Sequence, residues 1–414
     1  MRIIRPVLLP CLSALALAVL PLSVRAQLVQ GQYETEAPVG SWNTFPFLTA
    51  PSLGRGETSY AFASDSSCAL ANPALAARLP KLTLGLNGSL RRATIFRFGP
   101  VNTGVFTSRE NLTIDLSALD WVGLSFRLGR WAVAFNAALI ETYDRPSIAF
   151  DYYEEGRLLY SYKWNQTGLL RTFHLSLARE LRPNLTVGLG LGLLSGSTGL
   201  TSEESYAYAG YVIRDDRDQD LSGFTMNAGI LWEPLAGLRL ALAVRAPFSA
   251  KAASESALSY TSVSAGAPIV IRGSSRDKSR LPATVGAGVC WSALPRLQWA
   301  VDLTFIDWMS YRFQYFGETK TRAFRNSWKL GTGVEYEPEI RLWGATLTLP
   351  FRAGIVYDSQ PMRDPRSGVL GWTVGTGVAW NHLRLDLGAS FGSENGSGRK
   401  LRTTRTALAL GYRL

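Results

Sequence analysis

Charged, histidine and cysteine residues are scarce in this chain. Of its 414 residues, 18% are charged, two are histidine and three are cysteine. Soluble globular domains are usually nearer a quarter charged. So few histidines and cysteines leave too little material for a transition-metal site of ordinary ligand type, and we expect neither a metal nor a cofactor.

Long apolar runs are also missing beyond the first residues, and a membrane-crossing helix needs about 20 consecutive apolar residues. The chain is nevertheless 46% hydrophobic and 11% aromatic, with 39 glycines. Its mean hydropathy is only +0.04. Strands of a transmembrane β-barrel alternate lipid-facing apolar residues with small or polar lumen-facing ones, which hides the membrane signal from any average. The composition therefore favours an all-β, antiparallel transmembrane barrel.

The one apolar run follows Arg2 and Arg5, extends from Val7 to Leu22 and is followed by Val24-Arg25-Ala26. This pattern is typical of a cleavable secretory signal peptide covering residues 1–26. The alternative is a membrane anchor, for which the run is short and interrupted by prolines. The formal net charge of +11 makes anionic partners such as lipopolysaccharide phosphates available.

From about residue 81 to 414 the chain divides into segments of roughly ten residues with period-two alternation, as tilted membrane-spanning strands require. The residues expected to face lipid in one segment are Trp131, Val133, Phe135, Ala137 and Leu139. In a late segment, Leu383, Leu385 and Leu387 alternate with Arg384 and Asp386. Charged residues in such positions indicate a lumen.

Tight turns alternate with longer polar stretches. The turns lie at 129–130, 182–184, 234–237, 293–296, 337–344 and 381–382, and the longer stretches near 99–118, 144–166, 199–220, 249–280, 310–324, 358–370 and 393–401. We expect the turns to be periplasmic and the longer stretches to be outer loops, which gives about 14 strands.

Two further patterns support this register. Residues of outward parity beside the proposed periplasmic turns include Trp131, Trp232, Trp291, Trp299 and Trp380, where an aromatic girdle belongs. The chain ends in strict alternation at Leu408, Leu410, Tyr412 and Leu414, which resembles the signal that the barrel-assembly machinery reads, although that signal usually ends in Phe. Both patterns predict a protein of the bacterial outer membrane.

Residues 27–80 do not alternate, and they contain Asp65 and the motif Asn72-Pro73-Ala74. The segment resembles the amino-terminal hatch, or plug, of the FadL family of outer-membrane transporters. Two later segments also resemble the family: Leu281-Pro282-Ala283-Thr284 with the hairpin that follows it, and the stretch from Phe351 to Met362. The resemblance implies a fourteen-stranded barrel whose lumen contains the hatch.

The resemblance also implies a function, namely passive import of hydrophobic small molecules such as long-chain fatty acids, gated by the hatch. Relatives that serve protein secretion leave an alternative, a binding or scaffold barrel for secretion or surface attachment. An outer-membrane hydrolase is a third class, but His174 and His382 lie in no recognisable catalytic motif, so we expect no enzyme. No nucleic-acid-binding pattern is present.

Inward parity selects the basic residues that could pair with a substrate carboxylate, although structural ion pairs with lumen acids are the common alternative. These candidates are Arg352, Lys329, Arg384, Arg405, Arg245 and Arg127. Outer stretches supply aromatic residues for initial capture, or for packing of the loops on each other: Tyr206, Tyr208, Tyr211, Trp164 and Tyr160. Cys68 in the hatch and Cys290, of lumen parity, are either a disulfide that tethers the hatch or two buried thiols.

Overall fold

The computed structural model describes residues 45–95, 112–143, 145–262, 267–315, 318–320, 324–342, 344–361, 363, 366–396 and 402–414. The expected signal peptide and the beginning of the expected hatch, residues 27–44, lie outside these residues and stay predictions.

In the described part of the chain, antiparallel strands close into a 14-strand barrel. Its strands are β1 (Leu82–Ile95), β2 (Leu112–Leu128), β3 (Trp131–Thr142), β5 (Arg157–Arg182), β6 (Leu185–Tyr206), β7 (Tyr211–Leu235), β8 (Leu238–Arg245), β11 (Thr284–Leu294), β12 (Leu297–Ile306), β15 (Ser327–Tyr336), β18 (Phe351–Ser359), β19 (Gly368–Trp380), β20 (Leu383–Asn395) and β21 (Arg402–Arg413). Pairing of β1 with β21 closes the ring, from Thr83 opposite Arg413 to Thr94 opposite Arg402. The fold class and the strand number predicted from the turns are confirmed.

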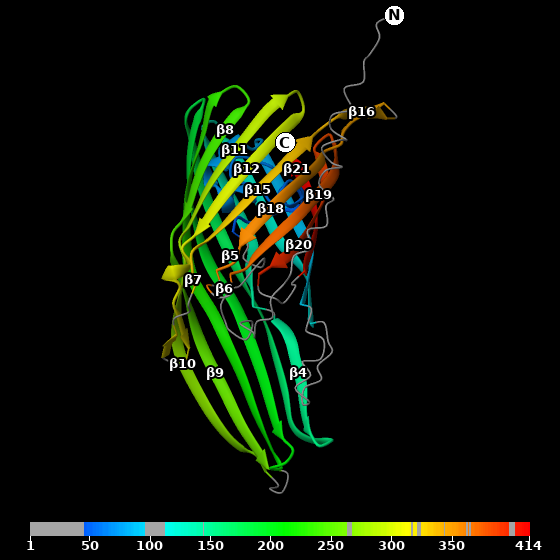
Figure 1. Cartoon of the computed structure of the whole chain (residues 1–414). Helices are drawn as coiled ribbons and strands as arrows, with labels where there is room; N and C mark the ends of the chain where they lie inside the picture. Colours follow the sequence, from blue (N-terminus) through cyan, green and yellow to red (C-terminus); the bar gives the residue numbers. More distant parts are fainter. Residues whose placement is uncertain are drawn as a thin grey trace, which may run out of the picture.

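Several strands continue far beyond the barrel. A strand needs about 9–11 residues to cross the membrane, whereas β5, β6 and β7 have 26, 22 and 25 residues. They pair with β4 (Arg145–Glu154), β9 (Phe248–Ser262) and β10 (Ile269–Leu281) to form a curved sheet, which we call the outer wall. In Figure 1 this wall extends below the closed barrel, on the side opposite the short turns.

The predicted loops at 144–166, 199–220 and 249–280 are therefore wrong in their local structure, because most of their residues are strand. Polar residues fill both faces of these strands, so the period-two signal is absent, and cross-strand pairing holds them together instead. Prolines divide two strands here. Pro247 separates β8 from β9, and Pro282 separates β10 from β11, because proline has no backbone N–H for the ladder.

Two short hairpins and a 3-10 helix complete the described elements outside the hatch. Hairpins are formed by β13 (Phe313–Tyr315) with β14 (Glu318–Lys320), and by β16 (Glu339–Leu342) with β17 (Ala345–Thr348). The 3-10 helix η2 (Trp308–Ser310) packs Trp308 against Tyr311 and Phe324, with ring centroids 5.8 and 5.9 Å away. Trp308 of this cluster lines a small cavity together with Pro282, just before β11.

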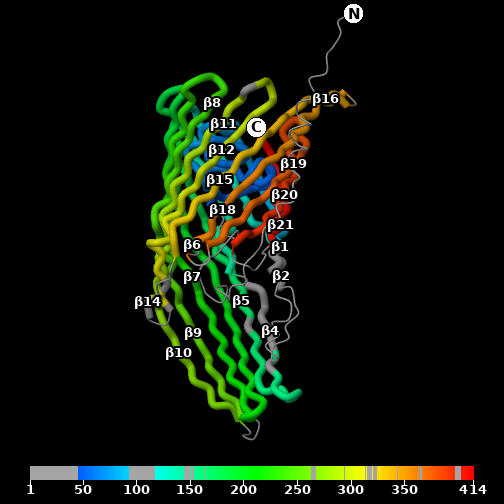
Figure 2. Tube along the Cα trace, viewed as in Figure 1, coloured from blue at the N-terminus to red at the C-terminus, as the bar shows by residue number. Residues whose placement is uncertain are grey.

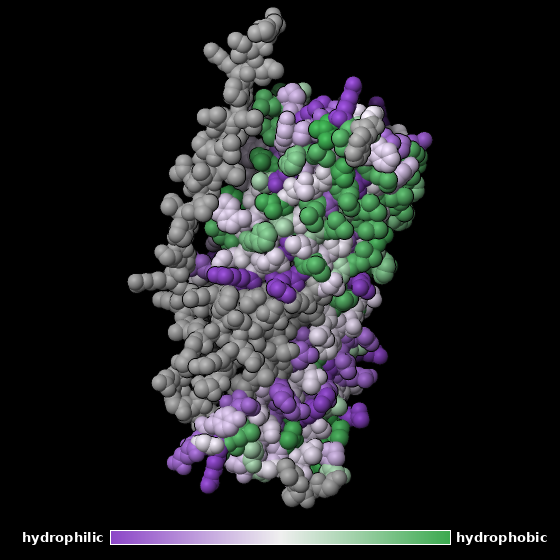
Figure 3. All heavy atoms as spheres, turned by 90° about the vertical axis from the view of Figure 1, so that its right-hand side faces the viewer, coloured by the Kyte–Doolittle hydropathy of each residue, from purple (hydrophilic) through white to green (hydrophobic). Residues whose placement is uncertain are grey.

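The predicted faces of the strands are confirmed, with one exception. Ala132 and Ala134 are buried, while Trp131 and Phe135 are 44% and 48% exposed on the lipid face. Leu139 is buried rather than lipid-facing, and it lies at the point where the β3–β5 register shifts, between Leu139 and Glu141. The girdle residues Trp131, Trp232, Trp291, Trp299 and Trp380 are all exposed beside short turns. Figure 3 shows hydrophobic residues gathered over the half of the molecule that carries those turns.

Residues 45–81 lie inside the barrel (Figure 2), and we call them the described hatch. They contain α2 (Ala50–Gly54), α3 (Cys68–Ala71) and the 3-10 helix η1 (Pro73–Arg78). Helix α2 contacts β18 to β21, and η1 contacts β2, β3, β5, β6 and β7, so the hatch touches opposite sides of the wall. Among the described residues no helix is long and apolar enough to cross a membrane.

Candidate functional site in the barrel lumen

The motif Asn72-Pro73-Ala74 joins the hatch to the barrel. The Asn72 side chain accepts a hydrogen bond from the Ala74 N–H at 3.1 Å and caps η1. Its amide donates to the backbone oxygens of Tyr60 in the hatch, at 2.9 Å, and of Ile230 in β7, at 3.3 Å. Proline suits the first position of a helix because no backbone partner is available there. The motif is thus a structural joint.

Asp65 connects two parts of the hatch. One carboxylate oxygen accepts from the Thr49 hydroxyl at 2.9 Å, beside α2, and the other accepts from the Ser67 N–H at 2.9 Å, before α3. Because Thr49 and Ser67 are buried, losing the Asp65 carboxylate would leave their hydrogen-bond donors without these partners. Asp65 therefore acts within the hatch, whereas the Asn72 motif also joins the hatch to β7, and neither lines the cavities at Arg245.

Glycines in the wall allow the hatch to approach it closely. An added Cβ at Gly188 of β6 would lie 2.5 Å from backbone atoms of Pro73 and Ala74. An added Cβ at Gly354 of β18 would lie 2.3 Å from the backbone of Gly56. These distances are too short for any side chain, so the strands can hold glycine alone at these points.

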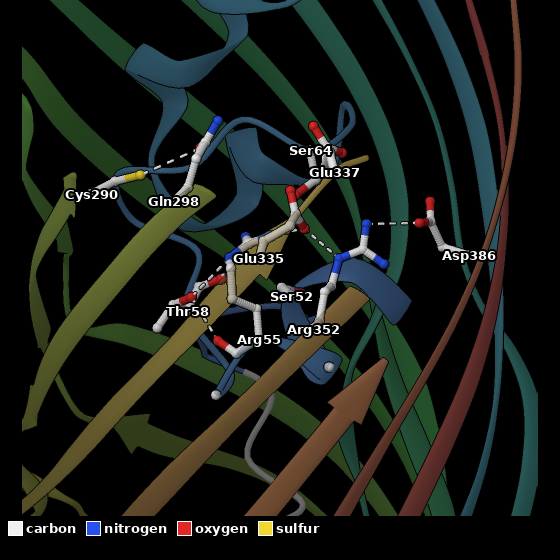
Figure 4. A network of polar contacts seen from close by, with 12 residues as sticks. Ser52, Arg55, Thr58, Ser64, Cys290, Gln298, Glu335, Glu337, Arg352 and Asp386 are labelled. Carbon is white, nitrogen blue, oxygen red and sulfur yellow. Dashed lines mark hydrogen bonds and ion pairs between the residues drawn. The ribbon is translucent and has the colours of Figure 1, made fainter. Parts of the chain in front are cut away.

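Most of the candidate cations are neutralised by structural ion pairs. Figure 4 shows the network around Glu335 and Arg352. Glu335 of β15 pairs with Arg55 of the hatch at 2.9 Å and with Arg352 of β18. Arg352 also pairs with Asp386 of β20 at 2.8 Å. Arg384 pairs with Asp386 at 2.9 Å and with Glu337 at 3.0 Å, which extends the chain of charges towards the short-turn side.

Three further candidates are paired as well. Lys329 pairs with Glu57 of the hatch. Arg405 pairs with Asp120 at 3.2 Å and donates to the backbone oxygen of Leu48 in the hatch at 3.1 Å. Arg127 pairs with Glu180 at 3.4 Å and is the most exposed of the set. Lys329 and Arg405 thus contact the hatch, whereas Arg127 pairs within the wall. Structural ion pairing is the alternative that the sequence left open for these residues.

Arg245, at the end of β8, is different. Its side chain is 9% exposed, and no carboxylate of the described residues lies within ion-pair distance. Its guanidinium donates to the Thr284 hydroxyl at 3.2 Å and lies 4.4 Å from the ring of Phe45 and 5.3 Å from the ring of Phe248. One guanidinium nitrogen, Nε, has no hydrogen-bond partner. Glu141 lines a cavity together with Arg245 but forms no ion pair with it, so an anionic ligand at the guanidinium would give this buried cation a direct partner.

Two small cavities meet at Arg245. The first, of about 30 Å³, is lined by Phe45, Phe47, Leu70, Ile140, Thr172, His174, Thr225, Asn227 and Arg245. The second, of about 10 Å³, is lined by Ile140, Glu141, Leu170, Arg245, Phe248, Leu281, Pro282 and Trp308. Apolar side chains from the hatch form one side of the first cavity. A cavity of about 150 Å³ is needed for a single benzene ring, so both are closed to a hydrocarbon as they stand.

His174 borders the first cavity. Its Nε2 lies 2.9 Å from Asn227 Oδ1, and its Nδ1 lies 3.1 Å from the Ser176 hydroxyl. The amide of Asn227 donates to the backbone oxygens of Ala69 and Leu70 at 3.1 and 2.9 Å. Ser176 is fully buried and lines neither cavity at Arg245. The three side chains therefore attach the hatch to the wall.

The predicted capture residues meet at the tip of the outer wall. Tyr206 stacks on Tyr211 with ring centroids 4.7 Å apart, and Tyr160 packs edge-on against Tyr206 at 5.0 Å. Tyr260 of β9, which the sequence analysis did not select, stacks on Tyr211 at 5.1 Å. Tyr208 is 68% exposed in the turn, and the side chain of Trp164 lies outside the described ones. The strand register places this tyrosine row on the lumen-facing side of the wall.

Cys68 and Cys290 are both free and buried, so the possible disulfide is not formed in this structure. They nevertheless belong to one buried cluster with Tyr60 and Phe62 of the hatch. Burial raises the pKa of the Cys68 thiol well above its usual range, because the thiolate would lose its hydration. The pair therefore supplies packing between hatch and wall.

A closed barrel with a lipid-facing apolar band, a plugged lumen and a cationic pocket among aromatic side chains defines the class of outer-membrane transporters for hydrophobic compounds. Residues 49–391 match the family model described as outer membrane protein transport protein (OMPP1/FadL/TodX). The chain belongs to this family, as its hatch motifs predict, and it is an outer-membrane protein. No curated protein matches it.

Solved structures agree in fold. A Pseudomonas aeruginosa FadL homologue is similar with a TM-score of 0.62 and 17% identity, over 88% of this chain and 98% of that one. The Ralstonia pickettii toluene transporter TbuX has a TM-score of 0.61 and 15% identity, over 90% and 99%. The P. putida toluene transporter TodX has a TM-score of 0.59 and 16% identity, over 89% and 98%.

Proposed function

We propose that this transporter imports hydrophobic small molecules that carry a carboxylate, such as long-chain fatty acids, passively and down their gradient. The observation that supports this most directly is Arg245, a buried cation with no acid partner among the described residues. A carboxylate at its guanidinium would supply the missing charge, and the aromatic rings of Phe45 and Phe248 would contact the first methylene groups.

Hatch movement is part of the proposal. The cavities at Arg245 are too small for a hydrocarbon, and Phe45, Phe47 and Leu70, which close the larger one, all belong to the hatch. Displacing these side chains is the simplest way to enlarge the cavity, because the remaining lining residues belong to paired strands. Substrate entry would thus be coupled to a shift of the hatch.

Mass spectrometry of the purified protein tests the site. Detergent-solubilised protein is incubated with palmitate, transferred to volatile buffer and analysed under native conditions. We expect one bound palmitate in the wild type and, in Arg245→Met, binding weakened roughly 10- to 100-fold, from about 1.5–3 kcal/mol for a charge-assisted hydrogen bond. Arg127→Met, which removes an exposed and paired cation, is the matched control.

Neutral aromatic hydrocarbons are the competing substrates, since TbuX and TodX are toluene transporters. Toluene has no carboxylate, so its binding would be unchanged or improved in Arg245→Met. Strong toluene binding with no palmitate binding in the wild type would refute the fatty-acid assignment and keep the transporter class.

A scaffold role in secretion or surface attachment is the second candidate. The long, paired strands of the outer wall favour it, because an ordered sheet with a stacked tyrosine row presents a firm surface. A stable protein partner that co-purifies with the wild type, is lost in Tyr206→Ala and leaves palmitate binding untouched would support this role.

A further inference from the structure

The lipid-facing band ends abruptly on one side of the barrel. One lateral row of paired residues on the outward face consists of Phe173, Leu193, Phe224, Ser249 and Arg280. Phe173, Leu193 and Phe224 are 59%, 63% and 46% exposed, as lipid-facing side chains should be. The row therefore marks the outer limit of the apolar band, and Arg280 already stands at that limit.

The next row outward, one pleat further along the strands, is polar. It consists of Arg171, Ser195, Ser222, Lys251 and Lys278, and all are exposed. Two residues along a strand advance about 6.8 Å, so on each of these strands the polar row begins directly beyond the apolar band. We call Arg171, Lys251, Lys278 and Arg280 the rim cations.

The rim cations lack acid partners. In the described part of the chain no carboxylate is within ion-pair distance of any of them. Acids on the same face begin only in later rows, with Asp220 opposite Ala253 and then Glu255 opposite Ser274. Two cations further out on this face are paired, Arg214 with Asp216 at 2.8 Å and Lys163 with Glu203 at 3.4 Å.

We propose that the rim cations bind the phosphates of lipid A, the phosphorylated headgroup that faces outward in the bacterial outer membrane. The chemistry fits in three respects. The cations are exposed, they are spaced across neighbouring strands, and they stand where apolar acyl chains give way to anionic headgroups. Arginine and lysine both bind phosphate oxygens well, arginine in a bidentate way. The site lies on the outer surface of the barrel and is separate from the lumen site at Arg245.

Native mass spectrometry with diphosphoryl lipid A, added to protein freed of lipopolysaccharide in detergent, tests this proposal. We expect Lys251→Ser with Lys278→Ser to weaken binding about thirtyfold, taking roughly fivefold for each cation near an anionic surface. Lys163→Ser with Arg272→Ser removes two positive charges further out on the same face and should change binding less than about twofold. Lipid A without its phosphates should bind the wild type at least as weakly as diphosphoryl lipid A binds the variant Lys251→Ser with Lys278→Ser, because that variant keeps Arg171 and Arg280.

Other outcomes would overturn the proposal. An equal loss of lipid A binding in the variant Lys251→Ser with Lys278→Ser and in the control variant would mean that only the total charge of this face matters. Full competition by millimolar inorganic phosphate would assign the cations to free phosphate rather than to a lipid. Because the variant Lys251→Ser with Lys278→Ser can fail to fold, Arg171→Ser with Arg280→Ser provides a second test with the other two rim cations, and unchanged binding in a folded form of it would refute the role of the row.

Discussion

Removal of Glu335 should release the hatch without unfolding the barrel. Its side chain is 2% exposed and neutralises Arg55 of the hatch at 2.9 Å and Arg352 of β18. In Glu335→Gln, Arg352 keeps Asp386 at 2.8 Å, but no other carboxylate of the described residues pairs with Arg55. Breaking a buried ion pair by removing one partner costs about 3–5 kcal/mol. The cost should therefore appear in hatch docking, at Arg55.

Hydrogen exchange measured peptide by peptide gives the readout. We expect protection of residues 50–62 to fall by about two to three orders of magnitude, since 1.4 kcal/mol corresponds to a factor of ten, while the strand peptides keep theirs. Glu339→Gln is the matched control, because Glu339 pairs with Arg296 at 2.8 Å with both side chains about half exposed, and such pairs contribute about 0–1 kcal/mol.

A double variant tests the reasoning itself. Replacing both charges, in Arg55→Met with Glu335→Leu, removes the uncompensated guanidinium and should recover most of the lost protection. If the double variant exchanges as fast as Glu335→Gln, the loss does not arise from an unpaired Arg55. Wild-type protection in Glu335→Gln would likewise refute the account, provided that heat-modifiable migration shows a folded barrel.

Two other predictions concern the contact between hatch and wall. Gly188→Ala should displace η1 and increase hydrogen exchange in residues 68–78, because the new Cβ would lie 2.5 Å from the hatch backbone. Gly411→Ala is the control and should not increase exchange, because its Cβ would meet nothing closer than 3.8 Å. Equal exchange in the two variants would contradict the close approach. Cys68 and Cys290 should resist alkylation in the folded protein and both react after denaturation without reductant, because both are buried and free; mass spectrometry that found neither alkylated would restore the disulfide.

The sequence predicts the barrel well because lipid and lumen impose opposite demands on successive residues. Strand faces, girdle tryptophans and the number of strands all follow from that alternation. The outer wall could not be predicted in this way, because strands with water on both sides need no alternation of apolar and polar residues. Tyr206 and Tyr211 have the pattern of loop residues, and only their pairing shows that they belong to strands. The bulge at Leu139 is likewise invisible, because it depends on the register with β5.

For the lumen cations, the sequence predicts the face of the strand but not the ion-pair partners. Parity correctly selects residues that face inward, but it cannot distinguish Arg352 from Arg245. The difference depends on partners remote in the sequence: Arg352 forms ion pairs with Glu335 and Asp386, whereas Glu141 lines a cavity with Arg245 without forming an ion pair with it. The sequence contained part of the information needed to select Arg245. Phe248 follows it closely, and Leu281-Pro282 lines the same cavity.

Closure of the ring has a consequence for biogenesis. Strand β1 pairs along its length with β21, and the backbone groups of Leu82 and Leu414 exchange hydrogen bonds of 3.1 and 2.9 Å. The ring therefore cannot close until β21 has been made, whereas the hatch precedes every strand. During synthesis the hatch is available first, and its contacts with β5 to β7 and with β18 to β21 offer a surface on which both halves of the ring can assemble before the seam forms.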